Sequence, residues 1–417
     1  MTNPTVAVAD AASGPVPPTL SATELPPSVG AFHYTRYKVC TPPLEQGGIE
    51  SGRHPVVIAG GGPVGMALAL GLANHGVRCV ILEADDTVCV GSRAACISRR
   101  SLEIMERLGV RPAFMAKGLP WTGGRSFYKT AEVFRFEMPH DAQQKLPPMI
   151  NLEQYYAEHY LLEEIFRRNE ATPGLIDIRW GTELTGLAQD DDEGVTMAVR
   201  NADGSYRLQG QWLAACDGGQ SFVRKALGLA LEGTGYEGRY VIIDIELHSD
   251  HPTERRAWFD PPWNPGSTVL MHRQPDDIWR IDYQLRVGQS TEEALQPAAV
   301  AEFVQRHLDA IGEGHLPWKT VDLGLPRGCD DARELPPRPR RVRGQCGACD
   351  ADLRRARAQL GFRRCGQPGV EAGVGRARPV GCGAARFLLA GAHCGLPRQC
   401  RERDAQHRVH VAAVARF

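Results

Sequence analysis

The fold of this chain is decided by residues 55–83, which read PVVIAGGGPVGMALALGLANHGVRCVILE. A short apolar run ends at Ala59 and is followed by three glycines and then by an apolar pattern of helical length. This order predicts a buried strand, a tight turn, a helix over about residues 63–75 that Gly76 ends, and a second strand over 77–82. A strand, helix and strand in this order are typical of a parallel sheet.

Three glycines and one glutamate of this unit have the spacing of a dinucleotide site. Gly60 allows the tight turn, Gly62 lets a pyrophosphate approach the backbone, and Gly65 lets the helix pack close to the sheet. The phosphates then lie at the positive end of the helix. Glu83 ends the second strand, where a carboxylate can accept hydrogen bonds from ribose hydroxyls. The alternative is a structural turn without a ligand.

Length and charge restrict the class of protein. The 417 residues suffice for two or three domains, and a net charge of -1 gives no reason to expect nucleic acid or an anionic membrane as partner. No apolar run has the length of a membrane span, and residues 1–50, rich in Pro, Ala and Ser, lack the pattern of a secretory signal. We expect a flexible extension over residues 1–50 and, from unpaired cysteine spacing, a cytoplasmic protein.

A second candidate site lies at Asp217-Gly218. It follows an apolar strand pattern over residues 208–216 and precedes Ser221, which can cap a short helix. Taken alone, this is an ordinary junction between strand, turn and helix. Residues 240–290 then alternate like sheet strands, which predicts a second, β-rich region.

Together these segments resemble the FAD-dependent aromatic hydroxylases, the single-component flavoprotein monooxygenases that include p-hydroxybenzoate hydroxylase. The branch with 3-(3-hydroxyphenyl)propionate and chlorophenol hydroxylases is the most similar, over roughly residues 54–320. The segments that carry the resemblance are VVIAGGGPVGMALALGLANHGVRCVILEAD from Val56, GSRAACISRRSLEIMERLGV from Gly91, INLEQYYAEHYLLE from Ile150, WLAACDGGQSFVRKALGL from Trp212, TERRAWFDPPW from Thr253 and HRQPDDIWRIDYQL from His272.

The resemblance implies an α/β fold of the glutathione-reductase-like type. An FAD-binding Rossmann domain would span residues 54–235, with inserted strands around 121–150, and a β-rich substrate domain would span 236–320. The residues that would contact FAD are Gly60, Gly62, Gly65 and Glu83 at the pyrophosphate and adenosine ribose, Arg93 near the phosphates and ribityl chain, Gln154 at the flavin chain, and Asp217 with Gly218 at the ribityl hydroxyls and for NAD(P)H. Two alternatives stay open: Arg93 as a solvated surface residue, and Asn151 with Gln154 as a capping box that begins a helix.

The resemblance also implies the activity of a monooxygenase. NAD(P)H would reduce the flavin, and O₂ would form a C4a-hydroperoxide that hydroxylates a phenolic substrate. The alternatives are an FAD-dependent NAD(P)H oxidoreductase that does not hydroxylate, and a non-catalytic FAD-binding remnant. No catalytic residue is assigned, although His272 and Tyr283 are candidates. Four aromatic residues are candidates for a substrate wall or for sheet core: Trp258, Phe259, Trp263 and Trp279.

Residues 321–417 break the pattern of the preceding chain. They contain nineteen arginines and seven of the twelve cysteines, but no Lys, Ser, Thr, Ile, Met, Asn, Tyr or Trp. The family's third motif, G-R-V-x-x-A-G-D-A-A-H, is absent after Trp318, and LLAGAH at 388–393 is a faint echo without the aspartate. We expect a shift of reading frame near residues 320–326 and a disordered tail. The alternatives are nucleic-acid binding and a zinc site at Cys346 and Cys349 with Cys365, Cys382 or His393.

Overall fold

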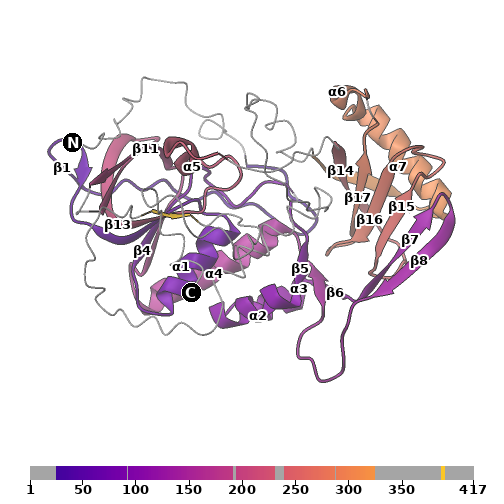
Figure 1. Ribbon diagram of the computed structural model, residues 1–417, viewed down its shortest axis with the longest axis horizontal. Helices are drawn as coiled ribbons and strands as arrows, with labels where there is room; N and C mark the ends of the chain where they lie inside the picture. Colours follow the sequence, from indigo (N-terminus) through magenta and orange to yellow (C-terminus); the bar gives the residue numbers. More distant parts are fainter. Residues whose placement is uncertain are drawn as a thin grey trace, which may run out of the picture.

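The computed structural model describes residues 25–91, 93–190, 194–230, 239–286 and 288–324, together with the backbone of Phe387–Leu389. These residues form a nine-stranded, a seven-stranded and a three-stranded sheet. Figure 1 shows the two large sheets side by side, with β5 and β6 of the small sheet between them. The predicted α/β class, with a Rossmann-type unit and a β-rich region, is confirmed.

The nine-stranded sheet has a parallel centre in which β13, β3, β4 and β10 lie side by side. Its apolar helix α1 connects β3 to β4 and packs against α4, which explains why α1 is apolar on all sides. The predicted stop is confirmed, because Gly76 has φ +69° and donates its N–H to the carbonyl of Ala73. The strands are β1 Leu44–Glu45, β2 Ile49–Glu50, β3 His54–Ala59, β4 Cys79–Leu82, β10 Ile176–Arg179, β11 Glu183–Asp190, β12 Gly194–Asn201, β13 Gly204–Ala215 and β19 Phe387–Leu389. The helices of this region are α1 Pro63–Ala73, α2 Arg99–Leu108, α3 Arg111–Lys117, α4 Gln154–Ala171 and α5 Phe222–Ala226.

The prediction of a flexible extension over residues 1–50 is wrong for residues 25–50. Phe32 is 4% exposed, and its ring centroid lies 4.6 Å from that of Tyr155 on α4. Glu50 of β2 forms a buried ion pair with Arg179 of β10, with Nη2 and Oε1 2.9 Å apart. Contacts of a buried aromatic ring with α4 and of a buried carboxylate with β10 therefore hold this segment in place. Residues 1–24 lie outside the described residues.

The seven-stranded sheet has the order β18-β14-β17-β16-β15-β7-β8. We expected the strands around 121–150 as an insertion in the first domain, but β7 and β8 belong to this sheet, because β7 pairs in parallel with β15 and β8 pairs with β7. The last strand, β18, continues to Gly324 and so passes the predicted boundary at residue 320. Its strands are β7 Gly123–Tyr128, β8 Ala131–Glu137, β14 Tyr240–Leu247, β15 Arg255–Phe259, β16 Thr268–Arg273, β17 Ile278–Gln284 and β18 Trp318–Gly324, and its helices are α6 Thr291–Ala294 and α7 Pro297–Ile311. The small sheet consists of β5 Cys96–Ser98, β6 Leu119–Trp121 and β9 Met149–Asn151.

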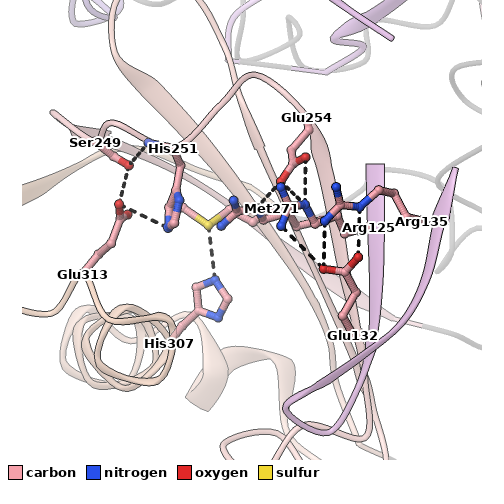
Figure 2. Close-up of polar contacts among 10 residues, drawn as sticks. Arg125, Glu132, Arg135, Ser249, His251, Glu254, Met271, His307 and Glu313 are labelled. Carbon is pink, nitrogen blue, oxygen red and sulfur yellow. Dashed lines mark hydrogen bonds and ion pairs between the residues drawn. The ribbon is translucent and has the colours of Figure 1, made fainter. Parts of the chain in front are cut away.

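Helix α7 covers the apolar face of the seven-stranded sheet. Figure 2 shows His307 pointing from α7 toward Met271 of β16, with its Nε2 3.4 Å from the sulfur. Burial lowers the pKa of His307 to about 3, so this imidazole is a neutral core side chain. At the sheet edge, Arg125 of β7 pairs with Glu254 at 3.0 Å and with Glu132 of β8 at 3.5 Å, which connects three segments (Figure 2).

The predictions for the C-terminal tail fall almost entirely on residues outside the described ones, including Cys346, Cys349, Cys365, Cys382 and His393. The shift of reading frame therefore stays a prediction. Among the helices that the structure describes, none has the length and apolar character that crossing a membrane requires.

Candidate functional site

The glycine-rich turn after β3 is tightly packed at two positions and open at a third. A Cβ at Gly60, where φ is +98°, would lie 2.5 Å from the carbonyl oxygen of Cys216. A Cβ at Gly65 would lie 2.0 Å from the carbonyl oxygen of Gly60. At Gly62, the nearest described atom would be Oε1 of Glu158, 3.9 Å away. Packing within the protein therefore requires Gly60 and Gly65, whereas Gly62 leaves space beside its backbone for a ligand.

The N-terminus of α1 follows directly on this turn. Gly62 is the N-cap residue and supplies no side chain to the free N–H groups of the first helical turn. The first turn also contains no acidic residue. The positive end of the helix is thus left for an anion such as a phosphate.

Glu83 leaves β4 with its carboxylate beside the same turn. The carboxylate accepts the N–H of Gly61 at 2.5 Å and the N–H of Asp85 at 2.9 Å. Burial nevertheless raises the pKa of Glu83 to about 7. Hydroxyl donors from a ribose would stabilise the ionised carboxylate further, and the ribose-binding role of Glu83 stays a prediction.

Asp217 lies at the end of β13, next to the turn. Its Cα would be 2.9 Å from a Cβ at Gly60, and its Oδ2 accepts the N–H of Val223 at 3.0 Å. The N-cap residue of α5 is Ser221, as predicted, and its hydroxyl accepts the N–H of Arg224 at 3.0 Å; the Asp217 carboxylate adds to this cap. Gly218 has φ +76°, and a Cβ added to it would meet no described atom within 4 Å. Both residues lie at the carboxyl edge of the parallel sheet, where ligands of such sheets bind.

Gln154 is the first residue of α4 and donates its Nε2–H to Oε1 of Glu158 at 2.7 Å. The other oxygen of Glu158 accepts the N–H of Cys89 at 2.6 Å. Burial raises the pKa of Glu158, while the positive charge of Arg93 acts in the opposite direction. The side chain of Arg93 is exposed, and its carbonyl accepts a hydrogen bond from Arg280 at 2.9 Å. Arg93 therefore has an electrostatic effect on the site as well as contact with solvent.

The capping-box alternative for Asn151 and Gln154 is wrong. The N-cap residue of α4 is Glu153, whose side chain makes no capping bond. Asn151 lies in β9, where its amide accepts from Trp121 at 2.8 Å and donates to the carbonyl of Arg273 at 2.6 Å. Asn151 thus connects two sheets instead of beginning a helix.

The contacts above join most of the predicted residues into one site. Gly60 lies against Asp217, and the N–H of Gly61 donates to Glu83. Gly62 lies near Glu158, which accepts a hydrogen bond from Gln154. An ionised Glu158 beside the turn would repel phosphate, and the burial that raises the pKa of Glu158 opposes its ionisation. A free helix N-terminus, open backbone and a carboxylate beside the turn together fit a dinucleotide such as FAD. Within the described ranges, no group of His, Cys, Asp or Glu side chains is arranged to hold a metal ion.

The aromatic candidates for a substrate wall are mostly sheet core. Trp258 and Trp279 are 4% and 1% exposed and belong to the apolar cluster beneath α7. Tyr283 stacks on Phe303 of α7 at 3.8 Å between ring centroids. His272 lies in register with Arg280 on the next strand and is also buried. Trp263 packs against the same core, and Phe259 is exposed.

Sequence reasoning missed two buried carboxyl groups, those of Glu153 and Glu158. Glu158 follows Gln154 by one helical turn, and this spacing could have indicated the pair. Glu153 carries no such signal, because only the tertiary structure encloses it.

Comparisons with known proteins show the family to which the chain belongs. A family model described as "FAD binding domain" matches residues 53–321, more than half of the chain. A 3-(3-hydroxy-phenyl)propionate/3-hydroxycinnamic acid hydroxylase of Mycolicibacterium smegmatis is 28% identical over 251 residues, which cover 60% of this chain and 43% of that protein. A rifampicin monooxygenase of Streptomyces venezuelae is 37% identical over 194 residues, 46% of this chain and 37% of that protein. The chain thus spans less than half the length of either relative.

Solved structures support the fold. A p-nitrophenol 4-monooxygenase from Pseudomonas putida matches with a TM-score of 0.56 and 22% identity, covering 66% of this chain and 67% of that one. An aklavinone-11 hydroxylase, solved in a ternary complex with FAD and aklavinone, matches with a TM-score of 0.55 and 21% identity, covering 66% of this chain and 54% of that one. At these identities the likeness concerns the fold alone.

Proposed function

The chain belongs to the FAD-binding domain family, and from this premise we propose that it is an FAD- and NAD(P)H-dependent monooxygenase that hydroxylates a phenolic ring. The observation that carries the proposal is the meeting of the glycine-rich turn, Glu83, Gln154 and Asp217 at one edge of a parallel sheet. FAD, when bound, supplies the redox and oxygen-transfer chemistry. The residues of this chain bind and orient the reactants and exclude water.

Each residue of the site has a distinct part in the proposed binding. The backbone at Gly62 and the N-terminus of α1 hold the pyrophosphate, and Glu83 accepts hydrogen bonds from the adenosine ribose. Gln154 and Asp217 hold the flavin chain. Asp217 does so while it caps α5, since one carboxylate oxygen is sufficient for the N–H of Val223.

The proposed substrate is a small phenol, with O₂ and NAD(P)H as co-substrates. Support comes from the curated relatives, one of which is named for hydroxylating a hydroxyphenyl acid. The described cysteines are free thiols, which fits the proposed cytoplasmic location.

The test begins with FAD titration of the full 417-residue chain, followed by absorbance and flavin fluorescence. Phenols, NADH or NADPH, and O₂ are then added, and hydroxylated product and hydrogen peroxide are measured separately. Stoichiometric FAD binding with hydroxylated product supports the proposal. Peroxide without hydroxylation over a broad phenol panel would instead favour an NAD(P)H oxidoreductase, and failure of a folded chain to bind FAD would favour a non-catalytic remnant.

Two variants distinguish ligand binding from folding. Asp217→Asn keeps an oxygen for the cap of α5 but removes the charge, so we expect weaker FAD binding with unchanged stability. Glu302→Gln on the exposed side of α7 is the matched control and should leave FAD affinity unchanged.

A further inference from the structure

A layer of buried polar side chains lies between the two large sheets. Its members are at most 2% exposed and come from β9, the N-terminus of α4, β14, β17 and the end of β16: Asn151, Glu153, Asp244, Arg280 and Gln274. Hydrogen bonds cross this layer from Arg280 to the carbonyl of Arg93 and from Asn151 to the carbonyl of Arg273. We call these five residues the buried polar layer.

Three members of the buried polar layer are paired within the protein. Arg280 and Asp244 form two hydrogen bonds of 2.9 Å each, so both charges are compensated. The amide of Asn151 accepts and donates, as described above. These contacts explain why three polar groups are stable without solvent.

Glu153 and Gln274 differ from the other three. Neither carboxyl oxygen of Glu153 and neither amide atom of Gln274 has a hydrogen-bond partner among the described residues. A buried polar group without a partner costs about 1–3 kcal/mol, so native proteins rarely leave four such atoms unpaired. A binding partner for these atoms is therefore expected.

The two side chains come from segments that meet. Glu153 follows Asn151 by two residues and Gln274 follows Arg273 by one, and the Asn151–Arg273 hydrogen bond joins these segments. The charge of Asp276, two residues beyond Gln274, also acts on the carboxyl group of Glu153. Glu153 and Gln274 thus come from two segments that contact each other next to the start of α4.

We propose that Glu153 and Gln274 bind the hydroxyl group of the phenolic substrate, an inference that rests on the proposed function. A carboxylic acid and a carboxamide each donate and accept hydrogen bonds, and a hydroxyl group does both in return. An ether oxygen only accepts. A substrate carboxylate also only accepts hydrogen bonds, so it could not satisfy the acceptor atoms of these two side chains.

The protonation of Glu153 agrees with this assignment. Burial raises the pKa of Glu153 to about 8; the backbone N–H of the same residue and the charge of Arg280 oppose this shift, whereas Asp244 and Asp276 reinforce it. The acid form, which has a proton to donate, is therefore present at neutral pH.

The experiment compares phenol with anisole, which has the same ring and a methyl ether in place of the hydroxyl. Equilibrium dialysis measures the affinity of the full chain for both, with and without FAD, at about pH 7. We expect wild type to prefer phenol by about tenfold or more, because a hydroxyl satisfies groups that anisole leaves unpaired. Glu153→Leu and Gln274→Leu should each reduce this preference to about twofold or less, while Glu302→Leu, an exposed control, should retain it.

The outcomes separate this inference from the proposed function. A wild-type chain without a preference for phenol, as expected if ordered water alone fills the site, overturns the inference. So does a preference that survives in both leucine variants after circular dichroism has shown that they fold. A preference that depends on Glu153 and persists without FAD supports the inference even if FAD fails to bind, in which case the proposed function alone fails. If neither FAD nor phenol binds to the folded chain, both are overturned.

Discussion

Replacing Glu153 by glutamine tests whether this carboxyl group is buried without an ionic partner. The variant has the same shape but cannot ionise. In the wild-type chain the pKa of Glu153 rises from 4.5 when unfolded to about 8 when folded, with burial as the main cause. The folded protein thus binds a proton that the unfolded chain releases, and the stabilisation by this group is complete below pH 4.5 and lost as the pH rises toward 8.

The size of the effect follows from the two pKa values. Between about pH 5 and pH 8, this single group should lower the free energy of unfolding of the wild type by roughly 3–4 kcal/mol. Other titrating groups contribute equally to both proteins and cancel in the comparison. The stability of Glu153→Gln relative to wild type should therefore increase by roughly 3–4 kcal/mol over this range of pH.

The assay is urea unfolding of both proteins at several values between about pH 5 and pH 8, followed by tryptophan fluorescence and circular dichroism. The control is Glu302→Gln, because Glu302 is 69% exposed and its removal should change little with pH. A difference between wild type and Glu153→Gln that stays constant within about 0.5 kcal/mol would refute the reasoning, since the carboxyl group would then ionise as freely as one in water.

Three further predictions concern packing, charge and the core histidine. Gly65→Ala should lower the free energy of unfolding by about 1–3 kcal/mol in urea titrations, because the new Cβ would clash with the carbonyl of Gly60. Gly62→Ala should instead fold normally and weaken FAD binding in fluorescence titrations. Arg280→Met should destabilise the chain by about 3–5 kcal/mol, since it leaves Asp244 buried and unpaired; equal stability of both chains in urea would contradict this. His307→Leu should remove a pH dependence of stability. Because burial lowers the pKa of His307 to about 3, its contribution to stability is complete above pH 6.5 and decreases as the pH falls. In urea unfolding, the wild type should therefore lose about 2–3 kcal/mol more than the variant between about pH 7 and pH 4.5.

The sequence alone was enough to predict the parallel unit from β3 to β4 and the turn between Asn201 and Gly204. Both depend on local chemistry: apolar periodicity, a glycine with positive φ, and a short loop between paired strands. The spacing from Gly60 to Glu83 also predicted a dinucleotide site, and the contact between Gly61 and Glu83 agrees with that prediction. This unit lies within residues 53–321, which the family model matches.

Pairing over long distances could not be predicted in the same way. The expectation of a disordered tail is wrong for Phe387–Leu389, which form a strand that pairs in parallel with β13, with Leu389 opposite Ala215 (Figure 1, yellow strand). The insertion strands β7 and β8 likewise joined the second sheet instead of the first. Backbone pairing of this kind depends on which edge the rest of the fold leaves open, and local composition does not encode it.

Local sequence therefore determined the parallel unit, its glycine-rich turn and the candidate cofactor residues, because these require particular residue types at fixed short spacings. Only the tertiary structure decided that Val29, Phe32 and Tyr34 belong to the core. It also decided that Asn151 connects two sheets, and that Glu153 and Gln274 are enclosed without partners among the described residues. Burial, and the shift in pKa that it causes, arises from segments far apart in the chain, so no short stretch of sequence contains it.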